Sequence, residues 1–523
     1  PQWTTFGLES KETGWGKVNL GNAWRLDYVL KLAQEKGIHL MLCFESFNVL
    51  QAGQQYSGWT DSVYNKANGG PLANPAEFWD SPEANRVFTN KMRYLVAWGF
   101  WNEVDLVNSF DAQKAARWHD RMATSLAALD PYDHLISTSA ATTPGIPAVD
   151  KITGIQFVQS HHYSSPDIAV TVAETEMAKR TQFPTKPHYF GEIGADWAGP
   201  RTDDDPEGYQ IHDTMWASIA AGSSGAASTW WWDNLIAPKI LYGLYTPVSK
   251  FMKGVDPAAE SFKPSLAVLK SVGKVSGTRD LVLENGPATW EVNSFNKPKT
   301  ITIDSKGASG PLPLAGIQHG ARNHPDKVNP VTFNVTAPKP IKLTVDVLEV
   351  SGYGGAGLQV LINGKMALDK EFTDPDDNAV TTPLTQFAGG YTVEIPAGKS
   401  TVVVRNSGND WFRVAYRFQG LIANSAPPVI GWTSAGKTTH LAWLRRQEAS
   451  WFNLFQRKQK FPSAPQVRLV LPLSAGTWRV ERWDTWKGTI LGKVQVKSTG
   501  MPVEVSVPSF RHDVAIKAVK VRG

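Results

Sequence analysis

Short apolar segments alternate with segments of helical periodicity over about the first 275 residues, and this alternation constrains the fold most. One helical pattern runs from Asn22 to a stop at Gly37, and Ser81-Pro82 has the residue types of a helix start. Further helices are expected near 111–128, 167–181 and 206–221, and strands at 38–44, 98–103, 135–139, 155–163, 188–192 and 226–232. Strands alternating with helices form a parallel sheet, and this many units favours a (β/α)8 TIM barrel in the α/β class.

After about residue 275 the sequence pattern changes to one of alternating strands, rich in Gly, Pro, Thr and Val. The pattern over 280–425 predicts a β-sandwich, with Asn363-Gly364 as a hairpin turn. Its segments at 362–365, 396–400 and 408–412 resemble the jelly-roll modules found beside carbohydrate-active barrels, which implies either sugar binding or structural support. Region 428–523 predicts a small C-terminal β-domain with strands at 439–444 and 467–471. We therefore expect a barrel over 1–275, followed by two all-β domains.

Composition excludes several classes of protein. Hydrophobic residues make up 42% and charged residues 19% of the 523 residues, as in ordinary soluble globular proteins. No apolar run reaches the roughly 18 residues that span a bilayer. The single cysteine, Cys43, rules out an intrachain disulfide framework, and its apolar neighbours predict a buried, inert thiol.

The net charge of +5 is small for this length. Basic clusters at 445–446 and 457–460 are compatible with a nucleic-acid footprint, but solvated surfaces usually look like this and no nucleic-acid motif accompanies them. We therefore expect no nucleic-acid partner. The 21 tryptophans suit stacking on sugar rings, although many will be core residues.

Two glutamates, Glu103 and Glu192, each end an apolar and aromatic run that predicts a buried strand. A carboxylate in such a place is costly to bury and is easily perturbed. Glycoside hydrolysis requires two such carboxylates, one as acid/base and one as nucleophile. From the pattern alone, two unrelated carboxylates that cap helices or pair with arginine remain an alternative.

The Asn102-Glu103 pair, followed 89 residues later by Glu192 in Gly-Glu, resembles a large clan of retaining (β/α)8 glycoside hydrolases. That clan includes the family 5 cellulases and mannanases. The resemblance implies that Glu103 is the acid/base, that Asn102 holds the sugar 2-hydroxyl, and that Glu192 is the nucleophile. It also implies that the chain begins near the end of the second strand, so that the first strand and an arginine of the second have no match here.

A helix that continues to Ala97 runs directly into a strand at Trp98. Helix-to-strand connections usually take about 2–6 residues. We expect that residues are missing from the sequence at this junction; the alternative is a genuine fusion of helix and strand.

Strand alternation places His161 and Tyr163 on one face, and the resemblance implies that both reach toward the sugar and the nucleophile. A zinc site at His161-His162 is not favoured, since neighbouring strand residues face opposite ways. Trp230 and Trp232 also share a face, and the resemblance implies that Trp232 forms the floor of the −1 sugar site.

Glu45, which ends the third strand, is a predicted substrate contact, with helix capping as the alternative. The long segment 46–80 that follows contains Trp59, Tyr64 and Trp79. Loops of this length are usually functional, so we expect it to shape the substrate cleft.

The resulting hypothesis is a retaining β-glycoside hydrolase acting on an oligosaccharide or polysaccharide, without a metal or organic cofactor. The alternative is a non-catalytic carbohydrate-binding protein on a similar barrel. Such an enzyme is expected to be secreted or periplasmic. The sequence does not indicate the sugar, the linkage, exo or endo action, or the oligomeric state.

Overall fold

The computed structural model describes residues 8–521, except 54–56, 95–98, 142–144, 164, 166, 198, 200–204, 274–277, 284–295, 313, 377–381 and 424–426. The chain divides into two compact units, and each is described by itself. Unit 1 comprises 1–161 with 179–191, and unit 2 comprises 162–178 with 192–523. The division runs through strands β3 (Val158–Tyr163) and β4 (His188–Gly194), which pair with each other. The predicted junction at 97–98 lies outside the described residues.

Unit 1 contains a set of strands that align in parallel. Strand β1 (Cys43–Ser46) pairs in parallel with β2 (Gly99–Asn102). The next segment, 136–140, forms only one bridge, a parallel one between Gly99 and Ser137. Its backbone nevertheless bonds to both neighbours, because Phe100 N–H donates to Ser137 C=O and His161 N–H donates to Ala140 C=O. The chain here therefore continues the sheet from β2 to β3.

Helices separate these strands, as the sequence pattern predicts. Helix α2 (Leu20–Lys36) ends at Gly37, whose φ of 66° is the left-handed conformation that glycine allows at a helix end. The Ser81 hydroxyl accepts a hydrogen bond from Ala84 N–H at the start of the next helix, as an N-cap does. The other helices of this part are α3 (Pro82–Tyr94), α4 (Ala112–Leu129) and α5 (Pro147–Asp150). Helix α6 (Ile168–Gln182) belongs to unit 2 up to residue 178.

Two predictions for β1 are wrong in detail. The strand begins at Cys43 rather than at residue 38, and Cys43 is exposed rather than buried. Strand alternation explains the exposure, since Phe44 faces the core and its neighbour must then face away. The Cys43 thiol donates to Glu45 C=O at 3.1 Å.

The long segment after β1 folds into 3-10 turns packed on the core of unit 1. These turns are η1 (Phe47–Leu50), η2 (Trp59–Asp61), η3 (Lys66–Asn68) and η4 (Pro75–Glu77). Trp59, Tyr64 and Trp79 are buried in the cluster that includes Phe100 and Trp118. These three aromatic residues therefore act as core residues.

Unit 2 begins with the ends of β3 and β4 and continues through buried helix α7 (Tyr209–Ala220). The strand predicted at 226–232 is not formed as such, although Trp230 N–H donates to Ile193 C=O of β4 at 2.9 Å. The chain turns instead into short helices: η7 (Trp232–Ile236), α8 (Ala237–Lys239), η8 (Leu241–Leu244), α9 (Tyr245–Met252) and α10 (Pro257–Glu260). The described residues up to 262 thus form a mixed α/β structure.

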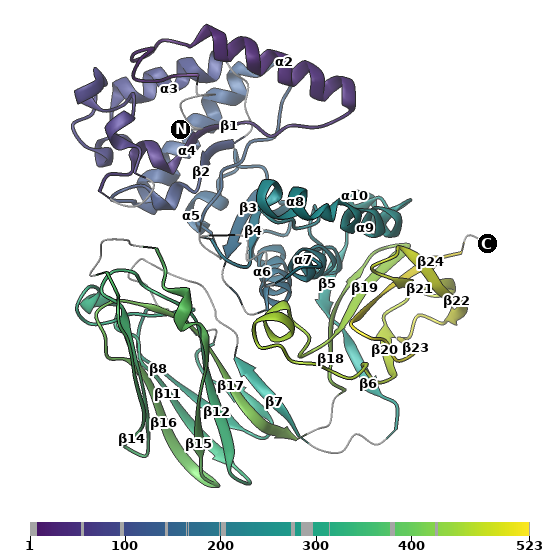
Figure 1. The fold of residues 1–523 in the computed structure, drawn as a ribbon. Helices are drawn as coiled ribbons and strands as arrows, with labels where there is room; N and C mark the ends of the chain where they lie inside the picture. The colour runs from purple at the N-terminus through teal and green to yellow at the C-terminus, as the bar shows by residue number, and fades with distance from the viewer. Residues whose placement is uncertain are drawn as a thin grey trace. The chain divides into compact units, whose positions relative to one another are not determined.

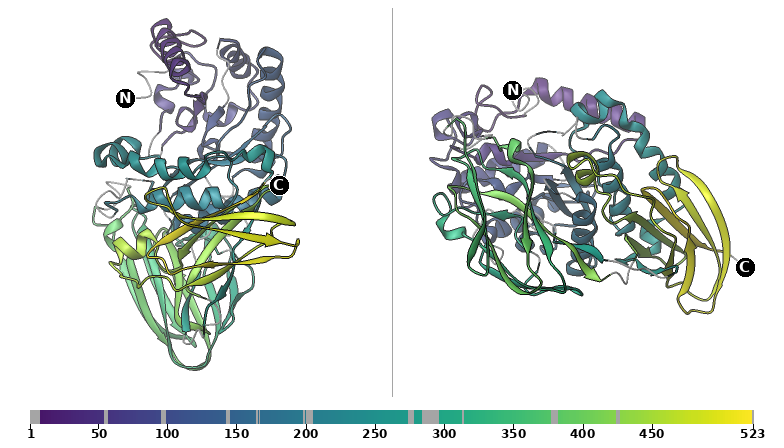
Figure 2. Two further views of the ribbon diagram at one scale, coloured as in Figure 1. Left: turned by 90° about the vertical axis from the view of Figure 1, so that its right-hand side faces the viewer. Right: turned by 60° about the horizontal axis from the view of Figure 1, so that its bottom comes forward.

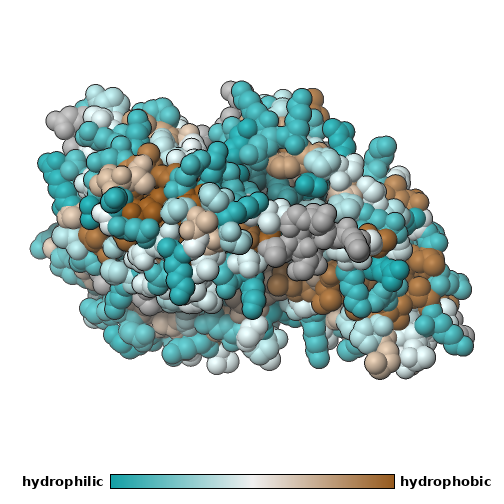
Figure 3. Space-filling model, turned by 90° about the horizontal axis from the view of Figure 1, so that it is seen from below, coloured by the Kyte–Doolittle hydropathy of each residue, from teal (hydrophilic) through white to brown (hydrophobic). Residues whose placement is uncertain are grey.

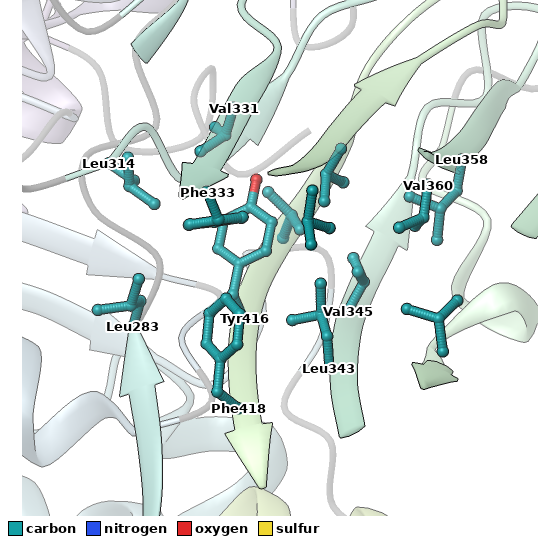
Figure 4. Packing of buried hydrophobic residues seen from close by; sticks show 14 of the residues in the cluster. Leu283, Leu314, Val331, Phe333, Leu343, Val345, Leu358, Val360, Tyr416 and Phe418 are labelled. Atoms are coloured by element: carbon teal, nitrogen blue, oxygen red, sulfur yellow. The ribbon is translucent and has the colours of Figure 1, made fainter. Parts of the chain in front are cut away.

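The region predicted as a β-sandwich consists of two facing sheets (Figure 1). Phe333 of one sheet packs edge-on against Tyr416 and Phe418 of the other, with ring centroids 5.0 and 5.2 Å apart (Figure 4). The predicted turn is confirmed, since Asn363 and Gly364 have φ of 50° and 78° and join two paired strands. One sheet contains β7 (Thr278–Leu283), β10 (Ile317–Gln318), β17 (Phe412–Ala423), β12 (Ile341–Val350) and β15 (Gly389–Ile395); the other contains β14 (Lys365–Phe372), β13 (Ala356–Ile362), β16 (Gly398–Asn406), β11 (Val331–Ala337), β8 (Lys299–Asp304) and β9 (Gly307–Ser309).

The C-terminal region adds a six-stranded and a three-stranded sheet, coloured light green to yellow in Figure 2 apart from two earlier strands. Those two, β5 (Lys263–Leu266) and β6 (Val268–Ser271), pair with β18 and β20 respectively. Residues 263–271, grouped by sequence with the barrel, thus complete the C-terminal sheets. The remaining strands are β18 (Val429–Ala435), β19 (Thr439–Arg446), β20 (Val467–Leu471), β21 (Gly476–Asp484), β22 (Thr489–Ser498), β23 (Val503–Val507) and β24 (Asp513–Lys520).

The face of the molecule in Figure 3 is mostly hydrophilic, with hydrophobic residues gathered in separate areas. Two arginines of the basic clusters do not lie free on the surface: Arg445 pairs with Asp167 and Asp213, and Arg457 pairs with Asp346. The expected lack of a nucleic-acid partner stays a prediction. Among the described helices, none combines the length and apolar character needed to cross a bilayer.

Candidate active site

Glu103 lies at a sharp backbone turn at the end of β2. Its φ of 53° and ψ of 51° are left-handed, and the 3-10 turn η5 (Val104–Leu106) begins directly after it. For a residue other than glycine this conformation costs about 1–2 kcal/mol. Neighbouring groups must therefore hold the turn in place.

The Glu103 carboxylate bonds to His161 of β3. His161 Nδ1 lies 2.8 Å from Glu103 Oε1, and the two side chains are 2% and 13% exposed. A hydrogen bond to a carboxylate is stronger where water is largely excluded. His161 therefore fixes the orientation of Glu103 and is placed to exchange a proton with it.

Asn102, the residue before Glu103, is oriented by Ser139. Ser139 Oγ lies 3.2 Å from Asn102 Oδ1 and accepts a hydrogen bond from Glu103 N–H at 3.0 Å. The hydroxyl accepts from Glu103, and the nearer of the two acceptors for its own proton is the amide oxygen, since Trp101 C=O lies at 3.4 Å. The Asn102 NH2 group is then directed away from Ser139, as a donor to a sugar hydroxyl would be.

Glu192, in unit 2, is held by Tyr163. The Tyr163 hydroxyl donates to Glu192 Oε2 at 2.8 Å, and Glu192 is 8% exposed. This bond orients the carboxylate and offsets part of the cost of burying its charge. The two residues that sequence alternation places on one face of β3 thus each bond to one of the two glutamates.

The glycine two residues after Glu192 is required by close packing. A Cβ atom at Gly194 would lie 2.9 Å from both Trp231 Nε1 and the ring of Tyr163. Real Cβ atoms do not approach other atoms so closely, so a side chain at this position would displace the Tyr163 ring or the indole. Gly194 therefore allows both aromatic rings to pack beside Glu192's strand.

Among the three consecutive tryptophans, Trp231 is the one whose indole lies beside Gly194. Its indole N–H donates to Asp196 C=O at 3.0 Å. Trp230 and Trp232, the residues predicted for the sugar site, are 47% and 62% exposed. Their role stays a prediction. Sequence reasoning missed Trp231, and the signal that could have found it was Gly194.

Glu45, the other predicted contact, is part of a buried cluster in unit 1. Lys91 forms ion pairs with both Glu45 and Glu9, and Tyr64 donates to Glu45 Oε1 at 2.6 Å. Burial raises the pKa of Glu9, although the charge of Lys91 opposes the shift. The Glu45 carboxylate thus contacts Lys91 and Tyr64, and neither contact caps a helix.

The neighbouring histidine, His162, lies in a different environment from His161. Burial, with the positive charge of Arg413 adding to it, lowers the pKa of His162 to about 3. Arg413 in turn forms an ion pair with Glu349 in which both side chains are buried. His161, by contrast, bonds to Glu103, so the two histidines have different neighbours.

The segments that follow Tyr163 and Glu192 contact both β-regions of unit 2. Trp451 of the C-terminal region donates its indole N–H to Ser165 C=O at 3.1 Å. A cavity of about 10 Å³ is lined by Ser165, Asp196, Glu349 and Trp451, among others. This is room for roughly one water molecule, so the contact is close.

No model of a known protein family matches the chain, and a search of curated proteins also finds no match. Solved structures with some likeness include a cycloisomaltooligosaccharide glucanotransferase from Paenibacillus sp., at 8% identity and TM-score 0.31, covering 84% of this chain and 65% of that one. A glucosidase from Croceicoccus marinus matches at 10% identity and TM-score 0.30, with 75% and 82% covered. A β-xylosidase from Caulobacter crescentus CB15 matches at 14% identity and TM-score 0.25, with 65% and 74% covered. The chain thus spans less than two thirds of the glucanotransferase, and likenesses at these TM-scores assign it to no family.

Proposed function

We propose that the chain is a retaining β-glycoside hydrolase on a (β/α)8 barrel, with Glu192 as nucleophile and Glu103 as acid/base. The observation that carries the proposal is the pairing of each glutamate with its own residue of β3. Glu103 bonds to His161 and Glu192 bonds to Tyr163. Residues two apart on a strand share a face, which supports the proposal that the two carboxylates serve one site.

In the proposed reaction, a Glu192 oxygen attacks the anomeric carbon while the bond to the leaving oxygen breaks. Glu103 gives its proton to that oxygen, and a covalent glycosyl-enzyme forms. Glu103 then accepts a proton from water, whose oxygen displaces Glu192 from the anomeric carbon. The Asn102 NH2 group is the proposed donor to the sugar 2-hydroxyl.

The substrate of this proposal is a β-linked oligosaccharide or polysaccharide. Because a polysaccharide does not cross a membrane, we infer that the enzyme acts outside the cytoplasm. A hydrolysis screen over β-glucan, mannan, xylan and galactan oligosaccharides tests the substrate class.

The deciding experiment follows the anomeric configuration of the first-formed product by NMR, before mutarotation. A retained β-anomer is expected, and an inverted product would overturn the roles of the two glutamates. Glu192→Gln is expected to abolish turnover while sugar binding persists. Glu103→Gln should harm substrates with poor leaving groups most, since activated aryl glycosides need little protonation. Glu83→Gln, which changes an exposed glutamate paired with Arg86, is the matched control.

If sugars bind but no glycoside is turned over, the chain is instead a non-catalytic carbohydrate-binding protein. Full activity in Glu192→Gln would likewise remove the proposed nucleophile. Both outcomes are read directly from the same set of variants.

A further inference from the structure

Ser139 makes hydrogen bonds to three residues of segment 101–104, which carries Glu103. Its N–H donates to Trp101 C=O at 3.0 Å, and its C=O accepts from Val104 N–H at 3.2 Å. Its hydroxyl accepts from Glu103 N–H at 3.0 Å. Ser139 is only 4% exposed, so water does not compete well for these bonds.

The Ser139 hydroxyl makes hydrogen bonds to Glu103 and Asn102 that the methyl group of an alanine could not make. Glu103 holds a left-handed conformation, and its N–H points at Ser139 Oγ instead of at a backbone carbonyl. The same Oγ lies 3.2 Å from Asn102 Oδ1, closer than its other acceptor, Trp101 C=O at 3.4 Å, so the hydroxyl can orient the amide. The Ser139 hydroxyl thus fixes both the backbone turn at Glu103 and the orientation of the Asn102 amide.

We propose that Ser139 is a positioning residue for Glu103 and Asn102, an inference that rests on the proposed function. Through Glu103 N–H it holds the carboxylate in line with His161 Nδ1. Through Asn102 Oδ1 it presents the amide NH2 group to the substrate. Its contribution is therefore to the proton transfer and to the contact with the sugar, in addition to the stability of the turn.

A neighbouring serine provides the matched control. Ser137 lies on the same segment and is fully buried. Its hydroxyl, however, donates to Phe157 C=O at 2.9 Å and accepts from Gln159, so it bonds toward β3 and not toward Glu103. Ser137→Ala should cost stability as Ser139→Ala does, without moving the acid/base.

The kinetic test measures kcat/KM for aryl β-glycosides whose leaving groups span a range of pKa. Ser139→Ala should lower kcat/KM about tenfold for the poorest leaving groups, which corresponds to one buried hydrogen bond, and much less for the most activated one. Ser139→Thr, which keeps the hydroxyl, should restore the wild-type dependence. Equal dependence on the leaving group in wild type, Ser139→Ala and Ser137→Ala would overturn the inference.

A second measurement separates this inference from the proposed function. With selectively 15N-labelled histidine, NMR reports the His161 Nδ1 environment in the absence of any substrate. Ser139→Ala should shift or broaden the His161 signal, whereas Ser137→Ala should not. An unchanged His161 signal in Ser139→Ala refutes the positioning role even if the wild type hydrolyses glycosides. A wild type that turns over no glycoside, with a shifted signal, refutes the proposed function alone.

Discussion

A buried arginine joins the C-terminal region to two helices of unit 2, and its removal should be severely destabilising. Arg445 of β19 is fully buried and pairs with Asp167 and, at 3.4 Å, with Asp213. The side chains of the two aspartates are only 7% and 6% exposed. Arg445→Met keeps a long apolar side chain but leaves the Asp167 carboxylate without the guanidinium, whereas Asp213 keeps its partner His512 at 2.9 Å. Removing one partner of such a buried pair costs about 3–5 kcal/mol, because a buried charge remains uncompensated.

The next residue provides the matched control. Arg446, the last residue of the same strand, is paired with Glu448, and the two side chains are 12% and 31% exposed, against 0% and 7% for Arg445 and Asp167. A partly exposed ion pair is worth less than about 1 kcal/mol. Arg446→Met should therefore shift the urea midpoint far less than Arg445→Met, although both remove one positive charge.

The loss of stability caused by Arg445→Met should also depend on pH. Burial raises the pKa of Asp167 above 3.8, and the charge of Arg445 opposes that shift. Without Arg445 the pKa in the folded state rises further above the unfolded value. A group with a raised folded pKa stabilises the fold at low pH and loses that contribution as pH rises. The Arg445→Met penalty should therefore be larger at about pH 7.5 than at about pH 5.

Urea unfolding followed by tryptophan fluorescence at both pH values measures these differences. Equal destabilisation by Arg445→Met and Arg446→Met would refute the claim that burial decides the magnitude. A penalty that is the same at both pH values would refute the claim that an uncompensated carboxylate causes it.

Three further predictions address other parts of the chain. Burial lowers the pKa of His119 to about 4. Because the unfolded state then binds more protons below about pH 6.5, the fold loses stability as pH falls toward 4. His119→Phe should flatten the pH dependence of the melting temperature over that range. Phe333→Ala should cost about 3–5 kcal/mol by opening a cavity in the sandwich, measured by urea denaturation, while Phe333→Leu should cost less. Gly194→Ala should cost about 1–3 kcal/mol by pushing its Cβ against Trp231 and Tyr163, and a change in indole fluorescence should report the displaced ring.

Local sequence signals predicted the helices and hairpins well, because they act within a few residues. The stop at Gly37, the cap at Ser81 and the turn at Asn363-Gly364 each depend on the conformational preference of one or two residues. The predicted strand at 467–471 coincides with β20 for the same reason, since Pro472 ends it.

The packing between distant segments could not be predicted from local sequence signals. Cys43 was expected inside because its neighbours are apolar, yet its exposure depends on which way β1 alternates. The same limit applies to Trp231. Its place in the site depends on the approach of its indole to Gly194, which its position in the Trp-Trp-Trp run does not reveal. For the candidate site, the glutamates and their β3 partners were predicted, whereas Ser139 was not, because a single serine carries no pattern.

The pairing of β5 and β6 with strands far along the chain bears on how the protein is made. Between Ser271 and Val429 lie 157 residues, and their synthesis takes about 8–30 s at roughly 5–20 residues per second. During that interval β5 and β6 have no partner strands on the ribosome. The sandwich, which lies in the sequence between these two strands and their partners, can already fold. Unpaired strand edges invite association with other chains. A fragment that ends at residue 275, or one that begins at residue 428, would make that transient exposure permanent, so both cuts should yield aggregation-prone protein.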